Sequence, residues 1–275
     1  MRSSKGLSNQ GRPPKGVTRR WFLGGVGAAA GLAAASAIPL TLINRDGHPV
    51  GHAAQEEMPD KAARQWAFVI DLRRCDGCKK CTEACQTTHS LPPEHEWIKV
   101  YELIDKEGNK HFLPRPCMQC ENPPCLKVCP VAATFKNDDG VILIDQGRCI
   151  GCRLCMAACP YEARYFNYKD PIKPATPVAN PMPEFPVPQQ KGTVGKCVFC
   201  VHFIDAGKLP ACVDACAMNA LYIADLNSDV MTNASGETYK LSKFLRDNDA
   251  YRWKEELNTS PRVWYVAGHA QDLEF

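Results

Sequence analysis

Sixteen cysteines, gathered in four groups of four with none left over, constrain this 275-residue chain more than any other feature. A disulfide framework scatters its cysteines, because each bridge joins distant points of the backbone. Compact groups are typical of metal ligation instead. In chain order the groups are Cys75, Cys78, Cys81 and Cys85 (group one), Cys117, Cys120, Cys125 and Cys129 (group two), Cys149, Cys152, Cys155 and Cys159 (group three), and Cys197, Cys200, Cys212 and Cys216 (group four).

The spacing within the groups favours iron and sulfur over zinc. Groups one and three match the bacterial run C-x2-C-x2-C-x3-C. Three sulfurs of such a loop face three irons of one cubane, and we expect the fourth cysteine to start a helix that leads to a second cluster. Zinc sites use two C-x2-C hairpins or mixed Cys/His pairs, a pattern that group four, and less readily group two, would fit alone. Together the four groups predict [4Fe-4S] clusters, with a zinc-stabilised interaction protein as the alternative.

No catalytic constellation accompanies the cysteines. The chain contains no C-x3-C-x2-C radical loop, no glycine-rich phosphate loop after a strand and no nucleophile elbow. None of the seven histidines occupies a cluster-ligand position, which excludes a Rieske-type centre. We therefore expect a non-catalytic protein. Basic residues flank groups one and three, where they tune the clusters, dock a partner or are simply solvated: Arg73, Arg74, Lys79, Lys80, Arg148 and Arg153.

The chain contains an internal repeat. Two β-like runs, Trp66–Asp71 and Val141–Asp145, lead into groups one and three and match at an offset of 74 residues. A second echo follows the last cysteine of groups two, three and four, with alanine four residues on and an aromatic residue six residues on. We expect the alanine to let backbone approach the cluster, and the aromatic residue to begin the strand that covers it: Phe135, Tyr165 and Tyr222.

A basic and then apolar segment precedes these elements. Residues 1–20 carry six basic residues and no acid, and the run from Trp21 to Ile43 is apolar and rich in glycine and alanine. The junction Thr18-Arg19-Arg20-Trp21-Phe22-Leu23 predicts a twin-arginine export signal over residues 1–37, with an uncleaved membrane anchor as the alternative. Without that segment, 27 basic residues face 30 acidic ones, a net charge of −3, so we expect no nucleic-acid partner.

The four cysteine motifs resemble the four-cluster iron–sulfur subunit of the dimethyl sulfoxide reductase and polysulfide reductase superfamily. The resemblance covers roughly residues 66–266. It implies four [4Fe-4S] clusters, because Cys152 is kept where some relatives carry Trp. It also implies an electron-transfer role that links a molybdopterin-type catalytic subunit to a quinone-interacting membrane subunit, on the periplasmic side of the cytoplasmic membrane. The alternatives are an exported subunit of a membrane-bound hydrogenase or of a sulfate-reducer-type quinone complex, and a free-standing exported carrier.

The implied fold is α+β, with two ferredoxin-like modules, an extended loop and a C-terminal extension. The inner module covers 111–170 and holds groups two and three, and the outer module joins 66–110 (group one) to 193–226 (group four). A polar linker (38–65) precedes the outer module, and a proline-rich loop (171–192) separates the inner module from the second part of the outer one. The extension covers 227–275. Within it we expect an interrupted helix over 240–257 and a closing strand over 262–266.

Gap lengths indicate how the groups pair. Only 19 residues separate Cys129 from Cys149, against 31 after Cys85 and 37 after Cys159. The short gap favours pairing group two with group three and group one with group four, as the resemblance also implies, whereas the 74-residue repeat favours pairing one with two and three with four. The crossed pairing gives a first set of Cys75, Cys78, Cys81 and Cys216, a second of Cys197, Cys200, Cys212 and Cys85, a third of Cys117, Cys120, Cys125 and Cys159, and a fourth of Cys149, Cys152, Cys155 and Cys129.

Overall fold

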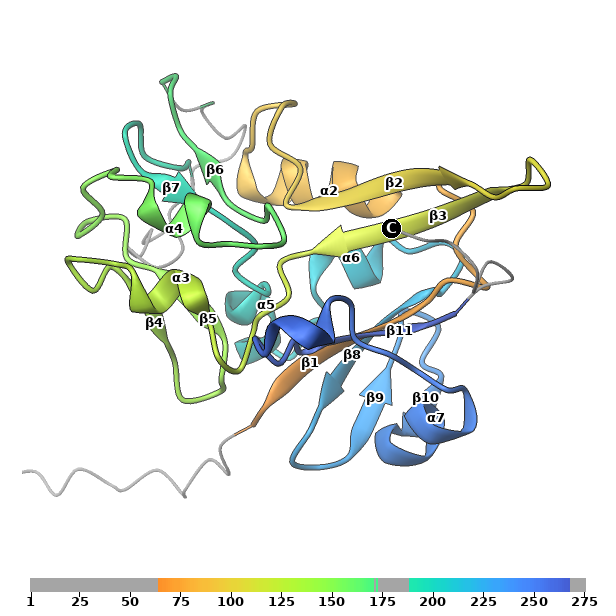
Figure 1. Cartoon of the computed structure of the whole chain (residues 1–275). Coiled ribbons are helices and arrows are strands. Elements are labelled where there is room, and N and C mark those ends of the chain that lie inside the picture. Colours follow the sequence, from red (N-terminus) through yellow and green to blue (C-terminus); the bar gives the residue numbers. More distant parts are fainter. Residues whose placement is uncertain (1–63, 171, 173–187, 268–275) are drawn as a thin grey trace, which may run out of the picture. The chain divides into compact units, whose positions relative to one another are not determined.

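A computed structural model describes residues 64–170, 172 and 188–267 (Figure 1). The predicted export signal, the linker up to residue 63 and most of the proline-rich loop lie outside the described residues. No helix of the described part is both long and apolar enough to cross a membrane.

A five-stranded sheet with the order β10-β9-β8-β1-β11 dominates the structure (Figure 1). Strand β1 (Trp66–Asp71) confirms the first predicted run, and it pairs antiparallel with β8 (Leu221–Asp225) and parallel with β11 (Val263–Val266). Strands β9 (Val230–Thr232) and β10 (Thr238–Lys240) extend the sheet on the β8 side. Both faces of β1 are buried, which explains why its residues before Asp71 are all apolar.

The two faces of β1 belong to different cores. Phe68 and Ile70 enter the large core that also contains many of the cysteines. Ala67 and Val69 enter a smaller core, which helix α7 (Leu241–Asp247) covers. The alternation places the cysteine-rich side of the chain on one face of the sheet only.

Three two-stranded ladders accompany the sheet. They pair β2 (Ile98–Ile104) with β3 (Lys110–Pro116), β4 (Thr134–Lys136) with β5 (Ile142–Ile144), and β6 (Tyr165–Phe166) with β7 (Val194–Gly195). Strand β5 confirms the second predicted run, and β4, β6 and β8 contain the three echoed aromatic residues, as expected. In Figure 1 the ladders β4–β5 and β6–β7 gather on one side of the five-stranded sheet.

The short helices correct one expectation. Four helices each contain the third cysteine of a group, where the sequence predicts that the helix starts only at the fourth: α2 (Lys80–His89), α3 (Pro124–Lys127), α4 (Leu154–Ala157) and α6 (Ala211–Asp214). The fourth cysteine lies inside α2 in group one and beyond the helix end in the other groups. Left-handed backbone at Lys79 and Arg153 turns the loop into its helix immediately, so the helix begins one cysteine earlier than predicted.

The C-terminal part is built into the sheet rather than appended to it. Strand β11 confirms the predicted closing strand, and β9 and β10 come from the same part of the chain. The interrupted helix is also confirmed, because α7 ends at Asp247 and a short 3-10 helix, η1 (Glu255–Leu257), follows; α5 (Val201–Asp205) completes the helices of the described residues.

Candidate iron–sulfur sites

All sixteen cysteines lie in the described part of the chain and carry free thiols. No three histidine, cysteine, aspartate or glutamate side chains of this part converge closely enough to hold a single metal ion. A cubane differs from one ion, because its thiolates bind separate iron atoms around a larger body. The arrangement of thiols around shared spaces therefore decides what the chain can hold.

Two small cavities are each lined by three cysteines of one group and one of another. The first cavity brings together Cys75, Cys78, Cys81 and Cys216, from groups one and four. The second brings together Cys129, Cys149, Cys152 and Cys155, from groups two and three. These are the members of the first and fourth sets.

The thiols of the second set are buried close to one another. Burial, and then the charges of Cys197 and Cys200, raise the pKa of Cys85 well above its ordinary value. Burial likewise raises the pKa of Cys212, and the thiolates of Cys200, Cys197 and Cys85 add to the effect. All four of these cysteines are buried, and they come from groups one and four.

The third set has the same character. Burial raises the pKa of Cys120 to about 12, with further contributions from Cys117, Cys125 and Cys159. Buried thiols of raised pKa keep their protons unless a cation stabilises the thiolate, and bound iron supplies that cation. Because each set brings four cysteine sulfurs together, the residues present fit a [4Fe-4S] cluster.

The cysteine loops share a backbone signature. In every group the residue two positions after the first cysteine is left-handed: Gly77, Gln119, Gly151 and Phe199. Such a residue turns the chain back on itself, so that successive side chains face a common point. At two of these positions only glycine fits, because a Cβ on Gly77 would collide with the Phe112 ring and one on Gly151 with the carbonyl oxygen of Gly192.

Hydrogen bonds reach several of the sulfurs. The backbone N–H of Ala220 donates to Cys216 Sγ at 3.2 Å, and that of Phe199 donates to Cys197 Sγ at 3.4 Å. His89, which is buried, places Nε2 3.3 Å from Cys200 Sγ. Since a thiolate only accepts hydrogen bonds, His89 is the donor when Cys200 binds iron. The sequence predicts that His89 is not a cluster ligand, but nothing in it indicates this contact with Cys200.

Two buried polar residues beside the loops were also missed. Gln119 donates from Nε2 to the Cys197 carbonyl at 2.9 Å and accepts from the Ile142 N–H at 2.9 Å, which ties groups two and four together. Lys196 Nζ donates to the same carbonyl at 2.6 Å. The left-handed place of Gln119 in its loop was the one available signal, since that place in groups one and three holds glycine.

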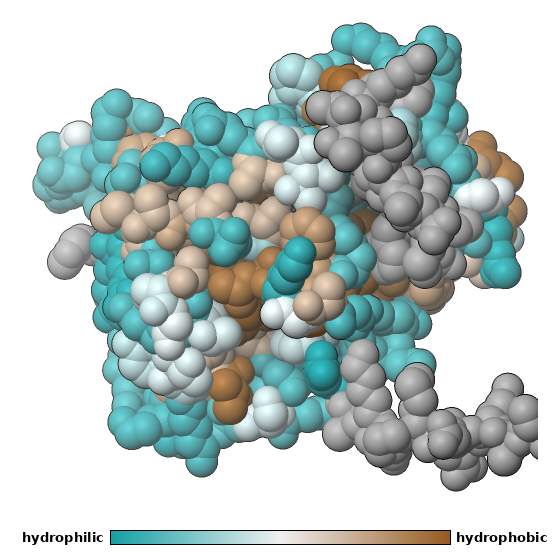
Figure 2. Space-filling model, turned by 180° about the vertical axis from the view of Figure 1, so that it is seen from behind, coloured by the Kyte–Doolittle hydropathy of each residue, from teal (hydrophilic) through white to brown (hydrophobic). Residues whose placement is uncertain are grey.

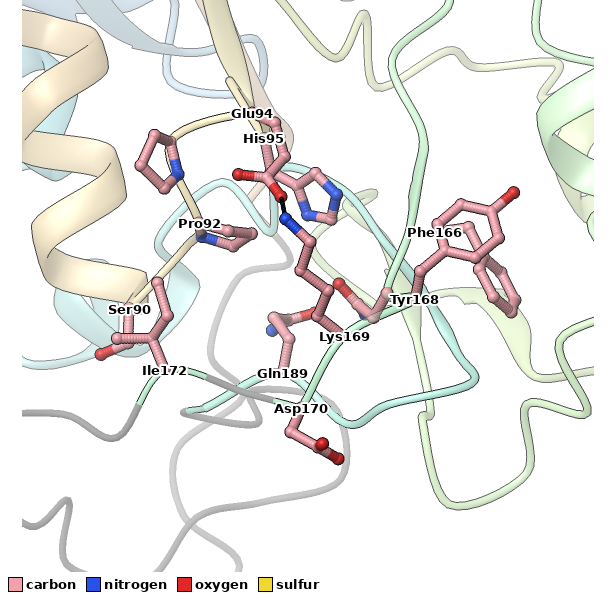
Figure 3. Close-up of a pocket in the computed structure, with 12 residues that line it drawn as sticks. Ser90, Pro92, Glu94, His95, Phe166, Tyr168, Lys169, Asp170, Ile172 and Gln189 are labelled. Carbon is pink, nitrogen blue, oxygen red and sulfur yellow. Dashed lines mark hydrogen bonds and ion pairs between the residues drawn. The ribbon is translucent and has the colours of Figure 1, made fainter.

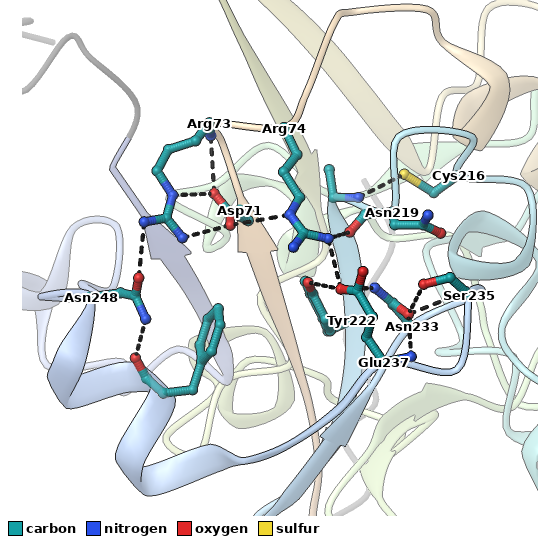
Figure 4. Close-up of polar contacts among 12 residues, drawn as sticks. Asp71, Arg73, Arg74, Cys216, Asn219, Tyr222, Asn233, Ser235, Glu237 and Asn248 are labelled. Carbon is teal, nitrogen blue, oxygen red and sulfur yellow. Dashed lines mark hydrogen bonds and ion pairs between the residues drawn. The ribbon is translucent and has the colours of Figure 1, made fainter.

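Group one is anchored by a polar network (Figure 4). Asp71 is 1 % exposed and accepts from Arg73 at two points, Nε to Oδ1 at 2.8 Å and Nη2 to Oδ2 at 2.7 Å. Arg74 donates to Glu237 at 2.8 Å, and Glu237 also accepts from the hydroxyl of Tyr222 at 3.1 Å. The arginines flanking group one are therefore paired with carboxylates, and they link the first loop to β8 and to the turn before β10.

Neighbouring thiols also connect the sets to one another. Cys81 of the first set contributes to the raised pKa of buried Cys85 in the second. Burial and then Cys117 of the third set raise the pKa of Cys197 in the second to about 11. Burial and, to a smaller extent, Cys125 of the third set raise the pKa of Cys155 in the fourth.

The exposure of the thiols agrees with this order of the sets, from the first through the second and third to the fourth. Cys78 in the first set and Cys152 in the fourth are the two exposed cysteines, whereas no cysteine of the second or third set is exposed. Exposed apolar side chains accompany both ends, with Met218 beside the first set and Ile150 beside the fourth.

A further pocket contains no cysteine. It lies between the end of α2 and β6, and Lys169 donates across it to Glu94 at 2.7 Å (Figure 3). Its walls are formed by side chains such as Pro92, His95 and Tyr168. Without thiols it offers no place for a cluster.

Comparisons with known proteins agree with this chemistry. Two models described as a 4Fe-4S dicluster domain match residues 109–174 and 74–133. A component of the selenate reductase of Mesobacillus selenatarsenatis is 40 % identical over 217 residues, covering 74 % of this chain and 72 % of that protein. The iron–sulfur cluster-binding subunit of menaquinone reductase from Nitratidesulfovibrio vulgaris is 38 % identical, covering 74 % and 89 %. A component of the tetrathionate reductase of Salmonella typhimurium is 34 % identical, covering 90 % and 88 %.

These relatives and the four thiol sets lead to one conclusion. The chain holds [4Fe-4S] clusters in ferredoxin-like dicluster domains of mixed α/β structure. Catalysis in such complexes is carried out by other subunits, which agrees with the absence of a catalytic constellation from the sequence. The chain belongs to the family of electron-transfer iron–sulfur subunits that serve dimethyl sulfoxide, selenate, tetrathionate and polysulfide reductases.

Proposed function

We propose that the sixteen cysteines hold four [4Fe-4S] clusters in the crossed sets given above. The first and fourth sets are supported by the two cavities that their thiols line. The second and third are supported by the mutual effects of buried thiols on one another's pKa. When bound, each cluster accepts and releases single electrons, while the protein fixes its ligands, hydrogen bonds and exposure.

The crossed sets go together with two ferredoxin-like modules. The inner module, 111–170, contains groups two and three, and one dicluster match covers 109–174. The outer module joins 66–110 to 193–226, and the antiparallel pairing of β1 with β8 supports that connection. The second match, over 74–133, spans groups one and two, and it favours the alternative in which group one pairs with group two. The cavity-lining thiols weigh more, because they report spatial neighbours rather than sequence similarity.

The chain relays electrons between a quinone-linked membrane subunit and a molybdopterin-type catalytic subunit. The observation that carries this proposal is the graded exposure of the cysteines, which leaves Cys78 and Cys152 exposed at opposite ends of the series and the middle sets covered. Apolar residues also gather around a hollow on one face of the molecule, within a hydrophilic surround (Figure 2). Apolar surface of this kind is typical of an interface with another protein.

Replacement of single cysteines tests the ligand sets. Cys85→Ser should alter the same paramagnetic signal as Cys197→Ser and leave the signal altered by Cys75→Ser intact. The unmodified chain should contain about sixteen irons and sixteen acid-labile sulfides. If Cys85→Ser and Cys75→Ser disturb one shared cluster, or if zinc replaces iron, the crossed scheme fails.

Export by the twin-arginine route is part of the same proposal. That route carries proteins already folded around cofactors, and Arg19 and Arg20 form the required pair. Replacing both with lysine should leave cluster-loaded protein in the cytoplasm, as measured by cell fractionation and the visible absorption of each fraction. Unchanged export of the double variant would refute it.

A further inference from the structure

Arg164 is a buried cation that has no carboxylate partner within 64–170, 172 and 188–267, although a buried arginine normally has one. It is 5 % exposed and lies five residues after Cys159. Its Nη1 donates to Thr134 Oγ1 at 3.2 Å, and its Nη2 is buried without a hydrogen-bond partner among the described residues. An unpaired buried charge is costly, so a group that offsets the charge is expected nearby.

The charges around Arg164 come from cysteines of two different sets. Burial lowers the pKa of Arg164, but the thiolates of Cys125, Cys155 and Cys117 raise it by more, so the guanidinium stays charged. Cys125 and Cys117 belong to the third set, and Cys155 belongs to the fourth. The geometry agrees, because Thr134, which accepts the hydrogen bond from Arg164, lines the cavity of the fourth set, and Arg164 itself closely follows Cys159 of the third set in the chain. The one side chain therefore acts on both sets of the inner module.

The hydrogen-bond partner of Arg164 stands at the equivalent place in the repeated pattern. Thr134 lies five residues after Cys129, just as Arg164 lies five residues after Cys159. Burial raises the pKa of Cys129, but hydrogen bonds from the backbone and side chain of Thr134, among others, lower it by more. The contact between Arg164 and Thr134 thus joins two corresponding positions of the repeated pattern. Each of the two residues acts on a cysteine of the fourth set, Arg164 on Cys155 and Thr134 on Cys129.

We propose that Arg164 is a positioning residue that supplies one shared counter-charge to the third and fourth clusters. The inference rests on the ligand sets proposed above. A thiolate-ligated cubane is anionic and gains one more negative charge on reduction, so a buried cation beside it favours the reduced state. Because Arg164 acts on both sets, it raises the reduction potentials of both clusters.

Redox titration of the full cluster-loaded chain, followed by electron paramagnetic resonance, tests this role. Arg164→Met should lower the equilibrium constant for reduction of the third and fourth clusters at least tenfold. For a one-electron couple this is a fall of about 59 mV in the reduction potential. The potentials of the first and second clusters should not change. Arg164→Lys should restore most of the shift. The matched control is Arg148→Met, which removes a cation directly before Cys149. The Arg148 side chain is 69 % exposed and pairs with Asp145 at 3.2 Å.

Each outcome decides the matter. A shift in both inner clusters with Arg164→Met, and none with Arg148→Met, supports the shared counter-charge. A shift in one cluster alone, or equal shifts with both variants, overturns it. If Arg164→Met loses iron, retention of iron by Arg164→Lys supports the need for charge, whereas equal loss shows that only shape matters. Failure of the ligand sets would appear separately, in the cysteine variants and the iron content of the unmodified chain.

Discussion

Replacing Asp71 with Asn tests the network that holds the first cysteine loop. The carboxylate is 1 % exposed and receives two hydrogen bonds from the Arg73 guanidinium and one from the Arg73 N–H at 3.1 Å. An asparagine keeps one acceptor, but it turns an amide N–H2 toward the guanidinium and removes the ion pair. Hydrogen bonds to charged groups contribute about 1.5–3 kcal/mol each, and the 42 % exposure of Arg73 screens part of that. We expect a loss of about 2–3 kcal/mol.

The internal repeat provides the matched control. Asp145 occupies the corresponding place in the second copy, but its partner Arg148 is 69 % exposed, and an asparagine there still accepts from the N–H of Gly147. The expected cost of Asp145→Asn is about 0–1 kcal/mol. For a domain of this size, Asp71→Asn should lower the unfolding midpoint by about 4–12 °C and Asp145→Asn by about 0–4 °C.

Far-ultraviolet dichroism and visible cluster absorption, recorded without oxygen at one fixed heating rate, measure both variants. The fixed rate matters because unfolding with cluster loss is irreversible. Equal midpoints for the two variants, or a larger drop for Asp145→Asn, would refute the assigned role of the buried Asp71 pair.

Two further predictions concern single contacts of the clusters. His89→Phe removes the donor 3.3 Å from Cys200 Sγ and should lower the reduction potential of the second cluster alone, which a redox titration resolves; a shift in all clusters would contradict it. Gly151→Ala should lower the iron content of the fourth set, because the added Cβ would collide with the Gly192 carbonyl and the φ of +69° is strained for alanine. The control Gly108→Ala carries a φ of +87° with open space around its Cβ, so equal iron loss in that variant would exclude the collision as the cause.

Local patterns predicted much of the fold. The run Trp66–Asp71, apolar up to its final aspartate, forms β1 with the predicted bounds, since a strand buried on both faces needs no alternation. The echoed Phe135, Tyr165 and Tyr222 all lie in strands, because the turn after each fourth cysteine leads directly into one. These features depend on neighbours in sequence, which is why the sequence reveals them.

Contacts between distant segments could not be predicted. Nothing in β11 indicates that it lies parallel to β1, because register depends on partners far away in the chain. His89, Gln119 and Arg164 are common residue types, and their roles arise only when another group is brought beside them. The sequence does not reveal where α2 and α4 start, because the left-handed residues before them, Lys79 and Arg153, are not glycines.

The parallel pairing of β1 with β11 has a consequence for biosynthesis. Phe68 pairs with Val263, 195 residues later, so the central sheet is incomplete until strand β11 has been made. At about 5–20 residues per second, the ribosome takes about 10–40 s to cover that distance. For most of this interval Cys75, Cys78 and Cys81 are already made, while Cys216 is not, and strand β11 is made later still. Groups two and three are complete long before, by residue 159. In the crossed arrangement, iron–sulfur insertion can therefore start with the inner pair of clusters during translation, whereas the outer pair must wait until Cys216 has been made.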